Sequence, residues 1–208
     1  TLHEISIDGR ILDEADWPVV PEGLSFSDLP KNCVLRVRSE CHPQSNTSLD
    51  GFYLSGGMYC TQCEPEGFRR MAFFPDRPDV MTVFTVRIEA DKAFPQLLSN
   101  GNLVETGEVD ADRHYALWHD PHPKPSYLFA CVVGDLDLAA DSFTTASGRT
   151  VDLHIYVEKD NVSLTGHAMD SLKRSMKWDE DTYGLEYDLD LFQIVAVSHF
   201  NMGAMENK

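Results

Sequence analysis

The fold of this chain is indicated most clearly by VFTVRIE at residues 83–89, where apolar and polar residues alternate from Phe84 onward. Phe84, Val86 and Ile88 would share one face of an extended segment, and the polar residues between them would share the other. A period of two is typical of a β-strand that buries one face and exposes the other. The stretch therefore predicts a half-buried strand.

Similar strand-like runs lie on both sides of this stretch. They occupy residues 2–7, 34–38, 97–104, 114–118 and 128–133. Asp8-Gly9 and Asn100-Gly101 are hairpin signals, because these residue types tolerate the positive φ angles of tight turns. Short strands separated by turns predict a sandwich or an open β-saddle. The proline-rich run at residues 121–125 cannot be helical, and we interpret it as a stiff connector.

The pattern changes after Gly134. It then predicts a strand, a helix and a second strand, at residues 151–157, 165–183 and 191–197. Gly184 marks the expected end of the helix. We therefore predict a mainly β fold with two parts: a β domain at residues 1–135, incomplete at its start, and the beginning of an α+β domain at residues 136–208.

The charge of the chain narrows its possible partners. Its 208 residues carry 17 Lys and Arg against 34 Asp and Glu, a formal net charge of −17. An acidic surface repels phosphate backbones and anionic membranes, so neither nucleic acid nor a membrane is an expected partner. No run of roughly 18 apolar residues is present, so no transmembrane helix is predicted.

The five cysteines are expected to be reduced thiols. Their number is odd, and a chain of this length does not need disulfides to stabilise it. This favours a cytoplasmic location. Cys60-x-x-Cys63 lacks the second pair of a zinc ribbon, and the surrounding β pattern does not provide the helix start of a thioredoxin-like redox site. Structural thiols are the favoured interpretation.

Gly203-Ala204-Met205-Glu206-Asn207 is the segment that points to chemistry. From the residue types alone it is either a turn after a strand with a solvated Glu206, or a place where another backbone approaches the small residues beside a carboxylate.

The segment matches, letter for letter, the G-A-M-E-N exopeptidase motif of the aminopeptidase N family of zinc gluzincins. Thr61-Gln62-Cys63-Glu64 resembles the Q-x-E segment of the same family, and the arginine- and proline-containing residues 67–78 resemble the stretch that follows it. The resemblance covers nearly the whole chain and is greatest to the bacterial type. The chain resembles the N-terminal part of such a protein, ending at the motif.

The resemblance implies a saddle-like β-sandwich domain followed by the first α+β part of a thermolysin-like catalytic domain. It also implies a zinc-dependent aminopeptidase that hydrolyses N-terminal residues from peptides. A free α-amine has a pKa of about 7.7–8.0 and is largely cationic at neutral pH, so converging carboxylates recognise it by charge-assisted hydrogen bonds.

The resemblance implies a substrate-binding role for residues from both ends of the chain. Glu64 and Glu206 are the implied amine anchors, and Gln62 shapes the first subsite. The backbone of Gly203 and Ala204 would pair with the substrate main chain. The remaining substrate-binding residues implied by the motif are Met202, which would line the first side-chain pocket, Met205 and Asn207.

The zinc ligands and the catalytic residues of the family are not expected within this chain. None of the eight histidines belongs to an H-E-x-x-H motif, which would supply two ligands and the general base. His119 and His122 are three apart and separated by Pro121, so we interpret them as surface residues beside a turn. The ligands of one zinc ion, and the tyrosine that stabilises the oxyanion, are expected downstream of Lys208. The chain alone is therefore expected to be inactive and to need the remainder of the catalytic domain.

Two alternatives stay open at this point. One is an epoxide hydrolase and aminopeptidase of the leukotriene-hydrolase type, against which Ala204 argues, because those relatives usually have Gly there. The other is a non-catalytic binding module that keeps the fold without the metal.

Overall fold

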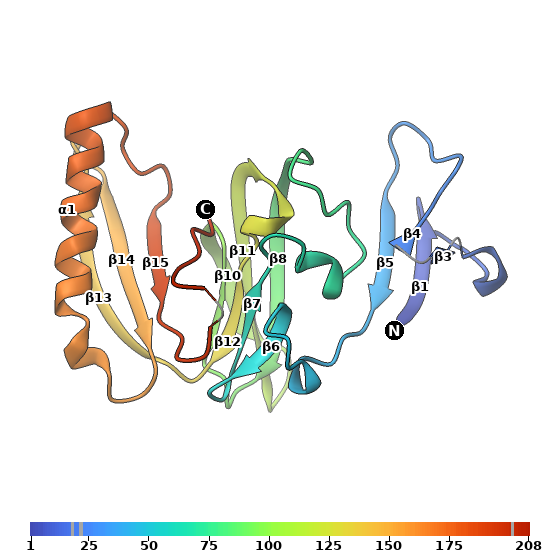
Figure 1. Ribbon diagram of the computed structural model, residues 1–208, viewed down its shortest axis with the longest axis horizontal. Helices are drawn as coiled ribbons and strands as arrows, with labels where there is room; N and C mark the ends of the chain where they lie inside the picture. The colour runs from blue at the N-terminus through green and yellow to red at the C-terminus, as the bar shows by residue number, and fades with distance from the viewer. Residues whose placement is uncertain (18, 21–22, 201) are drawn as a thin grey trace.

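The computed structural model describes residues 1–17, 19–20, 23–200 and 202–208, and confirms that the chain is mainly β (Figure 1). The strands of the first part are β1 (Leu2–Ile7), β2 (Arg10–Ile11), β3 (Val19–Val20), β4 (Gly23–Leu24), β5 (Leu35–Ser39), β6 (Gly51–Ser55), β7 (Met58–Gln62), β8 (Thr82–Asp91), β9 (Gln96–Ser99), β10 (Asn102–Glu108), β11 (Arg113–Lys124) and β12 (Cys131–Gly134). The second part contains β13 (Asp137–Thr144), β14 (Thr150–Val157), α1 (Gly166–Tyr183) and β15 (Leu191–Val195). Short 3-10 helices lie at Glu14–Asp16, Pro43–Ser45, Phe68–Arg70, Ser126–Leu128 and Val162–Leu164.

Three sheets form the body of the structure. Their strand orders are β10-β11-β8, β6-β7-β12-β9 and β13-β14-β15. In Figure 1, α1 covers the outer side of the third sheet, and the strands of the first and second sheets overlap in the view on the other side of β15. Two small sheets, β2-β1-β5 and β3-β4, lie at the N-terminal end. β14 and β15 are parallel, which requires a long crossover, and α1 belongs to that crossover.

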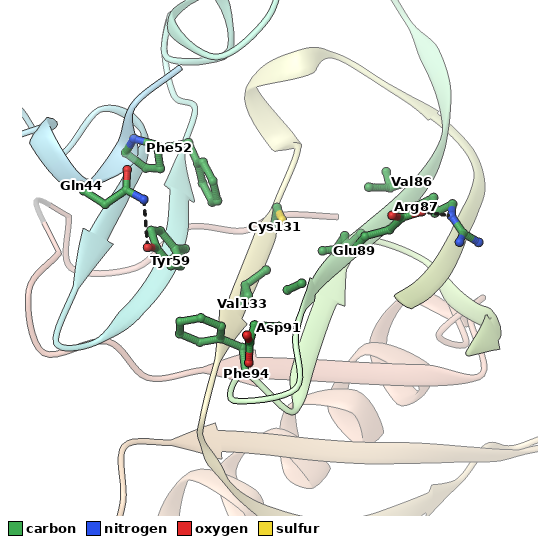
Figure 2. Close-up of a pocket in the computed structure, with 13 residues that line it drawn as sticks. Gln44, Phe52, Tyr59, Val86, Arg87, Glu89, Asp91, Phe94, Cys131 and Val133 are labelled. Atoms are coloured by element: carbon green, nitrogen blue, oxygen red, sulfur yellow. Dashed lines mark hydrogen bonds and ion pairs between the residues drawn. The ribbon is translucent and has the colours of Figure 1, made fainter. Parts of the chain in front are cut away.

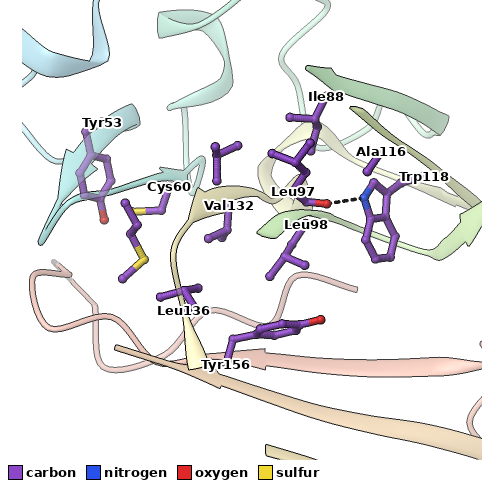
Figure 3. Close-up of a cluster of buried hydrophobic side chains, with 12 residues drawn as sticks. Tyr53, Cys60, Ile88, Leu97, Leu98, Ala116, Trp118, Val132, Leu136 and Tyr156 are labelled. Atoms are coloured by element: carbon purple, nitrogen blue, oxygen red, sulfur yellow. Dashed lines mark hydrogen bonds between the residues drawn. The ribbon is translucent and has the colours of Figure 1, made fainter. Parts of the chain in front are cut away.

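The β9 and β12 strands of the β6-β7-β12-β9 sheet are buried on both faces. Leu97 and Leu98 are adjacent in β9, so they point to opposite sides, yet both are almost completely buried. Val132 and Val133 are likewise adjacent in β12 and both buried. Figure 3 shows Leu97 on the side of Ile88 and Leu98 on the side of Tyr156. One hydrophobic cluster therefore extends through the sheet and joins the first part of the chain to the second.

The predicted helix and the predicted half-buried strand are both confirmed. Met169, Leu172 and Met176 of α1 are buried against β14, and Gly184 ends the helix in the left-handed conformation with φ +66°. In β8, Phe84 and Ile88 are buried. Among the described residues, no helix combines the length and the apolar character that crossing a membrane demands.

The hairpin predicted at Asp8-Gly9 is confirmed, but the one predicted at Asn100-Gly101 is wrong. Asp8 and Gly9 both have positive φ and connect β1 to its antiparallel partner β2. Asn100-Gly101 does make a tight turn, with φ +85° at the glycine. The strands on its two sides nevertheless belong to different sheets, because β9 pairs with β12 and β10 pairs with β11. The turn is a corner between sheets.

The connector predicted at residues 121–125 is also wrong, because all but the last of these residues belong to β11. The pairing of β11 with β10 ends at His119, and its pairing with β8 shifts between Asp120 and Lys124. Residues 121–123 pair with neither neighbour, so prolines there remove no ladder hydrogen bond. His119 and His122 accordingly lie on a strand and not beside a turn.

The domain boundary near residue 135 stays a prediction. β12 ends at Gly134 and β13 begins at Asp137, so the chain passes from the second sheet to the third within this interval.

Replacing Gly101 by Ala should destabilise the fold. A Cβ at this position would lie 2.3 Å from the carbonyl oxygen of His119 and 2.6 Å from the backbone of Asp120. Neither backbone can move without disturbing β11, so we expect a loss of about 1–3 kcal/mol in the free energy of unfolding. Urea denaturation of the intact protein measures it.

Gly148→Ala is the matched control. Gly148 has a similar φ of +88°, but apart from its chain neighbours no described residue has an atom within 4 Å of a Cβ placed there. An alanine at position 148 would have the same left-handed backbone strain as one at position 101, but no steric clash with a neighbouring strand. Equal losses for the two variants would show that the corner is not tightly packed.

Candidate substrate-binding site

Gln62, at the end of β7, is the buried residue of the predicted site. Its side chain is 3% exposed, and its Nε2 donates to the carbonyl oxygen of Glu64 at 3.2 Å. Its Oε1 is buried and accepts no hydrogen bond from the residues that the structure describes. Leaving a buried acceptor unpaired is costly, so such an atom is well suited to receive a donor from a ligand. Glu64 follows two residues later and is half-buried.

The chain after β15 returns to the β6-β7-β12-β9 sheet, and Figure 1 shows its red C-terminal segment passing between β15 and the strands of that sheet. Ser55 Oγ donates to the carbonyl oxygen of His199 at 3.0 Å. Glu158 accepts a hydrogen bond from Ser198 Oγ at 2.7 Å. These bonds attach the beginning of the segment to the last residue of β6 and to the residue that follows β14.

The structure brings the two predicted motifs together. Gln62 Nε2 lies 3.9 Å from Met205 Sδ, although the two residues are 143 positions apart in the sequence. Glu206, the next residue, is exposed. Within the described chain, no hydrogen bond or ion pair joins Glu64 to Glu206. Two carboxylates repel each other, so this pair needs a cation between them to come into contact.

The small residues of the motif are accessible. Met202, Gly203 and Ala204 are all exposed, and Met202 is 41% exposed. Apart from its two chain neighbours, no residue that the structure describes has an atom within 4 Å of a Cβ placed on Gly203. A peptide backbone can therefore reach this part of the main chain.

Asn100 is a residue of this region that the sequence analysis did not assign to the site. Its Nδ2 donates to the carbonyl oxygen of Asn207 at 2.6 Å. Asn207 Nδ2 in turn donates to the carbonyl oxygens of Leu128 and Phe129, at 3.2 and 3.4 Å. The only sequence signal was the Asn-Gly pair, which indicates a turn and says nothing about a partner 107 residues away.

The described residues do not fit a metal centre. Across residues 1–17, 19–20, 23–200 and 202–208, no group of three or more His, Cys, Asp or Glu side chains is arranged to hold a metal ion. The arrangement fits recognition of a substrate by polar and acidic groups.

Cys60 and Cys63 are buried thiols. Both are at most 2% exposed and neither forms a disulfide. Burial raises the pKa of Cys60, and burial together with the negative charges of Asp76 and Asp50 raises the pKa of Cys63 to about 12. Because the thiolate is the reactive form of cysteine, both are unreactive near neutral pH.

A cavity of about 480 Å³ opens elsewhere, between β8 and the sheet of β6, β7 and β12 (Figure 2). Phe52, Tyr59 and Phe94 line it, and Gln44 Nε2 donates to Tyr59 Oη at 3.1 Å across its rim. None of the predicted site residues belongs to it.

Comparison with known proteins identifies the family. Residues 24–128 match the Peptidase M1 N-terminal domain, and residues 167–208 match the Peptidase family M1 domain. The first match covers half of the chain, and the second contains the whole G-A-M-E-N segment. The chain belongs to peptidase family M1.

Individual relatives agree with this assignment. The chain is 56% identical over 207 residues to aminopeptidase N of Caulobacter vibrioides, covering 100% of this chain and 24% of that protein. It is 54% identical over 193 residues to aminopeptidase N of Escherichia coli, covering 92% and 22%. The crystal structure of Legionella pneumophila aminopeptidase A in complex with aspartic acid matches with a TM-score of 0.90 and 33% identity, covering 100% and 25%. The chain thus spans about a quarter of the length of these relatives.

Thiol labelling should distinguish the cysteines by burial. At pH 8 we expect iodoacetamide to modify the half-buried Cys33 and Cys41 before Cys60 and Cys63. Because the pKa of Cys63 is about 12, its thiolate fraction, and hence its labelling rate, should rise about tenfold per pH unit below that value. Peptide mapping by mass spectrometry after timed labelling gives the order. Early modification of Cys63 at pH 8 would contradict the buried position.

Proposed function

We propose that this chain supplies the α-amine-binding part of a zinc-dependent aminopeptidase that removes N-terminal residues from peptides. The observation that carries the proposal is the contact between Gln62 and Met205, because these residues belong to the segments of Glu64 and Glu206. The relatives named aminopeptidase N, at 54–57% identity, support the same activity.

Amine recognition follows from the groups available. A substrate ammonium has three N–H donors, and the proposed site offers three acceptor groups: the carboxylates of Glu64 and Glu206, and the Oε1 of Gln62, which has no partner among the described residues. The ammonium is also the cation that two nearby carboxylates need between them. A peptide bond further along the substrate carries no charge, so the site would select the first residue.

The rest of the motif would hold the remainder of the substrate. The exposed backbone of Gly203 and Ala204 would pair with the substrate main chain in the manner of an added strand. Met202 and Met205 would contact its first side chain, and flexible thioethers suit side chains of different shapes.

The metal and the catalytic groups are proposed to lie outside residues 1–208, in the remainder of the catalytic domain. One zinc ion is expected there, and the chain alone is expected to be inactive. Peptides with a free N-terminus are the proposed substrates, and the net charge of −17 disfavours nucleic acid and anionic membranes. A cytoplasmic location is also proposed, because cysteines stay reduced in that compartment.

Replacing either carboxylate should impair the intact enzyme. We expect Glu206→Gln and Glu64→Gln each to lower kcat/KM for an amino-acid anilide by about 100-fold, because each removes a charge-assisted hydrogen bond to the substrate amine. Steady-state kinetics with a free-amine substrate measures the effect.

Glu66→Gln is the matched control. Glu66 is an exposed acidic residue two positions from Glu64 whose carboxylate faces Arg69, at 3.6 Å. Its replacement should leave kcat/KM unchanged. Wild-type kinetics in both Glu64→Gln and Glu206→Gln would remove the proposed role of these residues.

A further inference from the structure

We propose that Asn100 is a positioning residue for the amine site, holding the end of the G-A-M-E-N segment in the place where Glu206 meets the substrate. The inference rests on the proposed function and adds a residue that lies in neither sequence motif.

The carboxamide of Asn100 is fully used in hydrogen bonds to backbone groups. Its Nδ2 donates to the carbonyl oxygens of Asn207 at 2.6 Å and Leu128 at 3.0 Å, and its Oδ1 accepts from Ala130 N at 2.7 Å. The side chain is 7% exposed. Only an amide offers two donors and an acceptor in this arrangement, so neither a carboxylate nor a hydroxyl replaces it fully.

The position of Asn100 is itself fixed. It occupies the corner between β9 and β10, and the next residue, Gly101, packs directly on the backbone of His119 and Asp120. The corner therefore gives the amide little freedom to follow the segment if that segment moves. It acts as a fixed point on the first part of the chain.

Two further hydrogen bonds attach the segment to the first part of the chain, and a third lies within the segment. Asn207 Nδ2 donates to the carbonyl oxygens of Leu128 and Phe129, and Lys208 N donates to the carbonyl oxygen of Glu206 at 2.8 Å. The residue after Glu206 is thus held through both its side chain and its carbonyl group. The Glu206 side chain is exposed, so the position of this backbone determines the region that its carboxylate can reach. Holding it in place reduces the entropy lost when the substrate binds.

Asn100→Asp in the intact enzyme tests the inference, because it keeps the shape of the side chain and replaces the Nδ2 donor by an acceptor that faces two carbonyl oxygens. We expect KM for a free-amine anilide to rise about tenfold with a smaller change in kcat, since ground-state binding of the amine is weakened. In a Glu206→Gln background the same substitution should have no further effect on KM, because the group it positions is already absent.

Asn102→Ala is the matched control. Asn102 lies two residues away and also joins the two parts of the chain, but through Asp190, with hydrogen bonds of 3.0 Å in each direction. Its replacement should leave KM unchanged. If Asn100→Asp does not fold, Asn100→Ser, which removes the carboxamide without adding a charge, replaces it in the same comparison of single and double variants.

The outcomes separate the two proposals. Unchanged kinetics in Glu206→Gln would overturn the proposed amine-binding role of Glu206, and with it the positioning role that depends on Glu206. If Glu206→Gln has a large effect, two results would overturn the positioning role alone. In the first, the Asn100 variant leaves KM unchanged. In the second, it raises KM by the same factor in the Glu206→Gln enzyme as in the wild type.

Discussion

The burial of both faces of the β6-β7-β12-β9 sheet at β9 and β12 is the constraint on which the rest of the structure depends. One face packs on Ile88 and Trp118 of the first sheet, and the other packs on Tyr156 of β14. Partly buried side chains of β15 and the residues after it join the same cluster: Leu191, Val195, Val197 and Phe200. Burying this apolar surface away from water is favourable, and it holds the second part of the chain against the first.

Polar contacts then determine where the two parts meet. Gln193 Nε2 donates to the carbonyl oxygen of Ser99, Ser55 Oγ donates to that of His199, and Asn100 Nδ2 donates to that of Asn207. Hydrophobic burial has no direction, whereas each of these bonds requires a particular pair of atoms. Together they place the G-A-M-E-N segment beside the end of β7, where Gln62 and Glu64 lie. A site that recognises a single charged group needs this accuracy, because two carboxylates separated from each other do not share one ammonium.

The sequence predicted the elements with local periodicity and missed those that depend on distant partners. The alternation in residues 83–89 and the spacing of Met169, Leu172 and Met176 are local patterns, and both were confirmed. Asn100-Gly101 indicated a turn correctly but a hairpin wrongly, because a turn signal does not specify which sheet each flanking strand joins. The prolines of β11 were wrongly predicted to lie in a connector for a related reason. Three residues of this strand have no pairing partner, so prolines there interrupt no ladder hydrogen bond.

The candidate site shows the same division. The two motifs were recognisable as residue patterns, but their meeting depends on a fold that no local pattern encodes. Asn100 went unassigned because its three partners, at positions 128, 130 and 207, are far from it in the sequence. The zinc ligands and the role of each motif residue stay predictions.

A crystal structure of the intact protein with a bound free amino acid tests whether the two acidic side chains form one amine site. The account predicts that the ligand ammonium lies within hydrogen-bonding distance of the carboxylates of both Glu64 and Glu206. An ammonium that contacts neither carboxylate, or a Glu206 side chain directed away from the Gln62 end of β7, would contradict it.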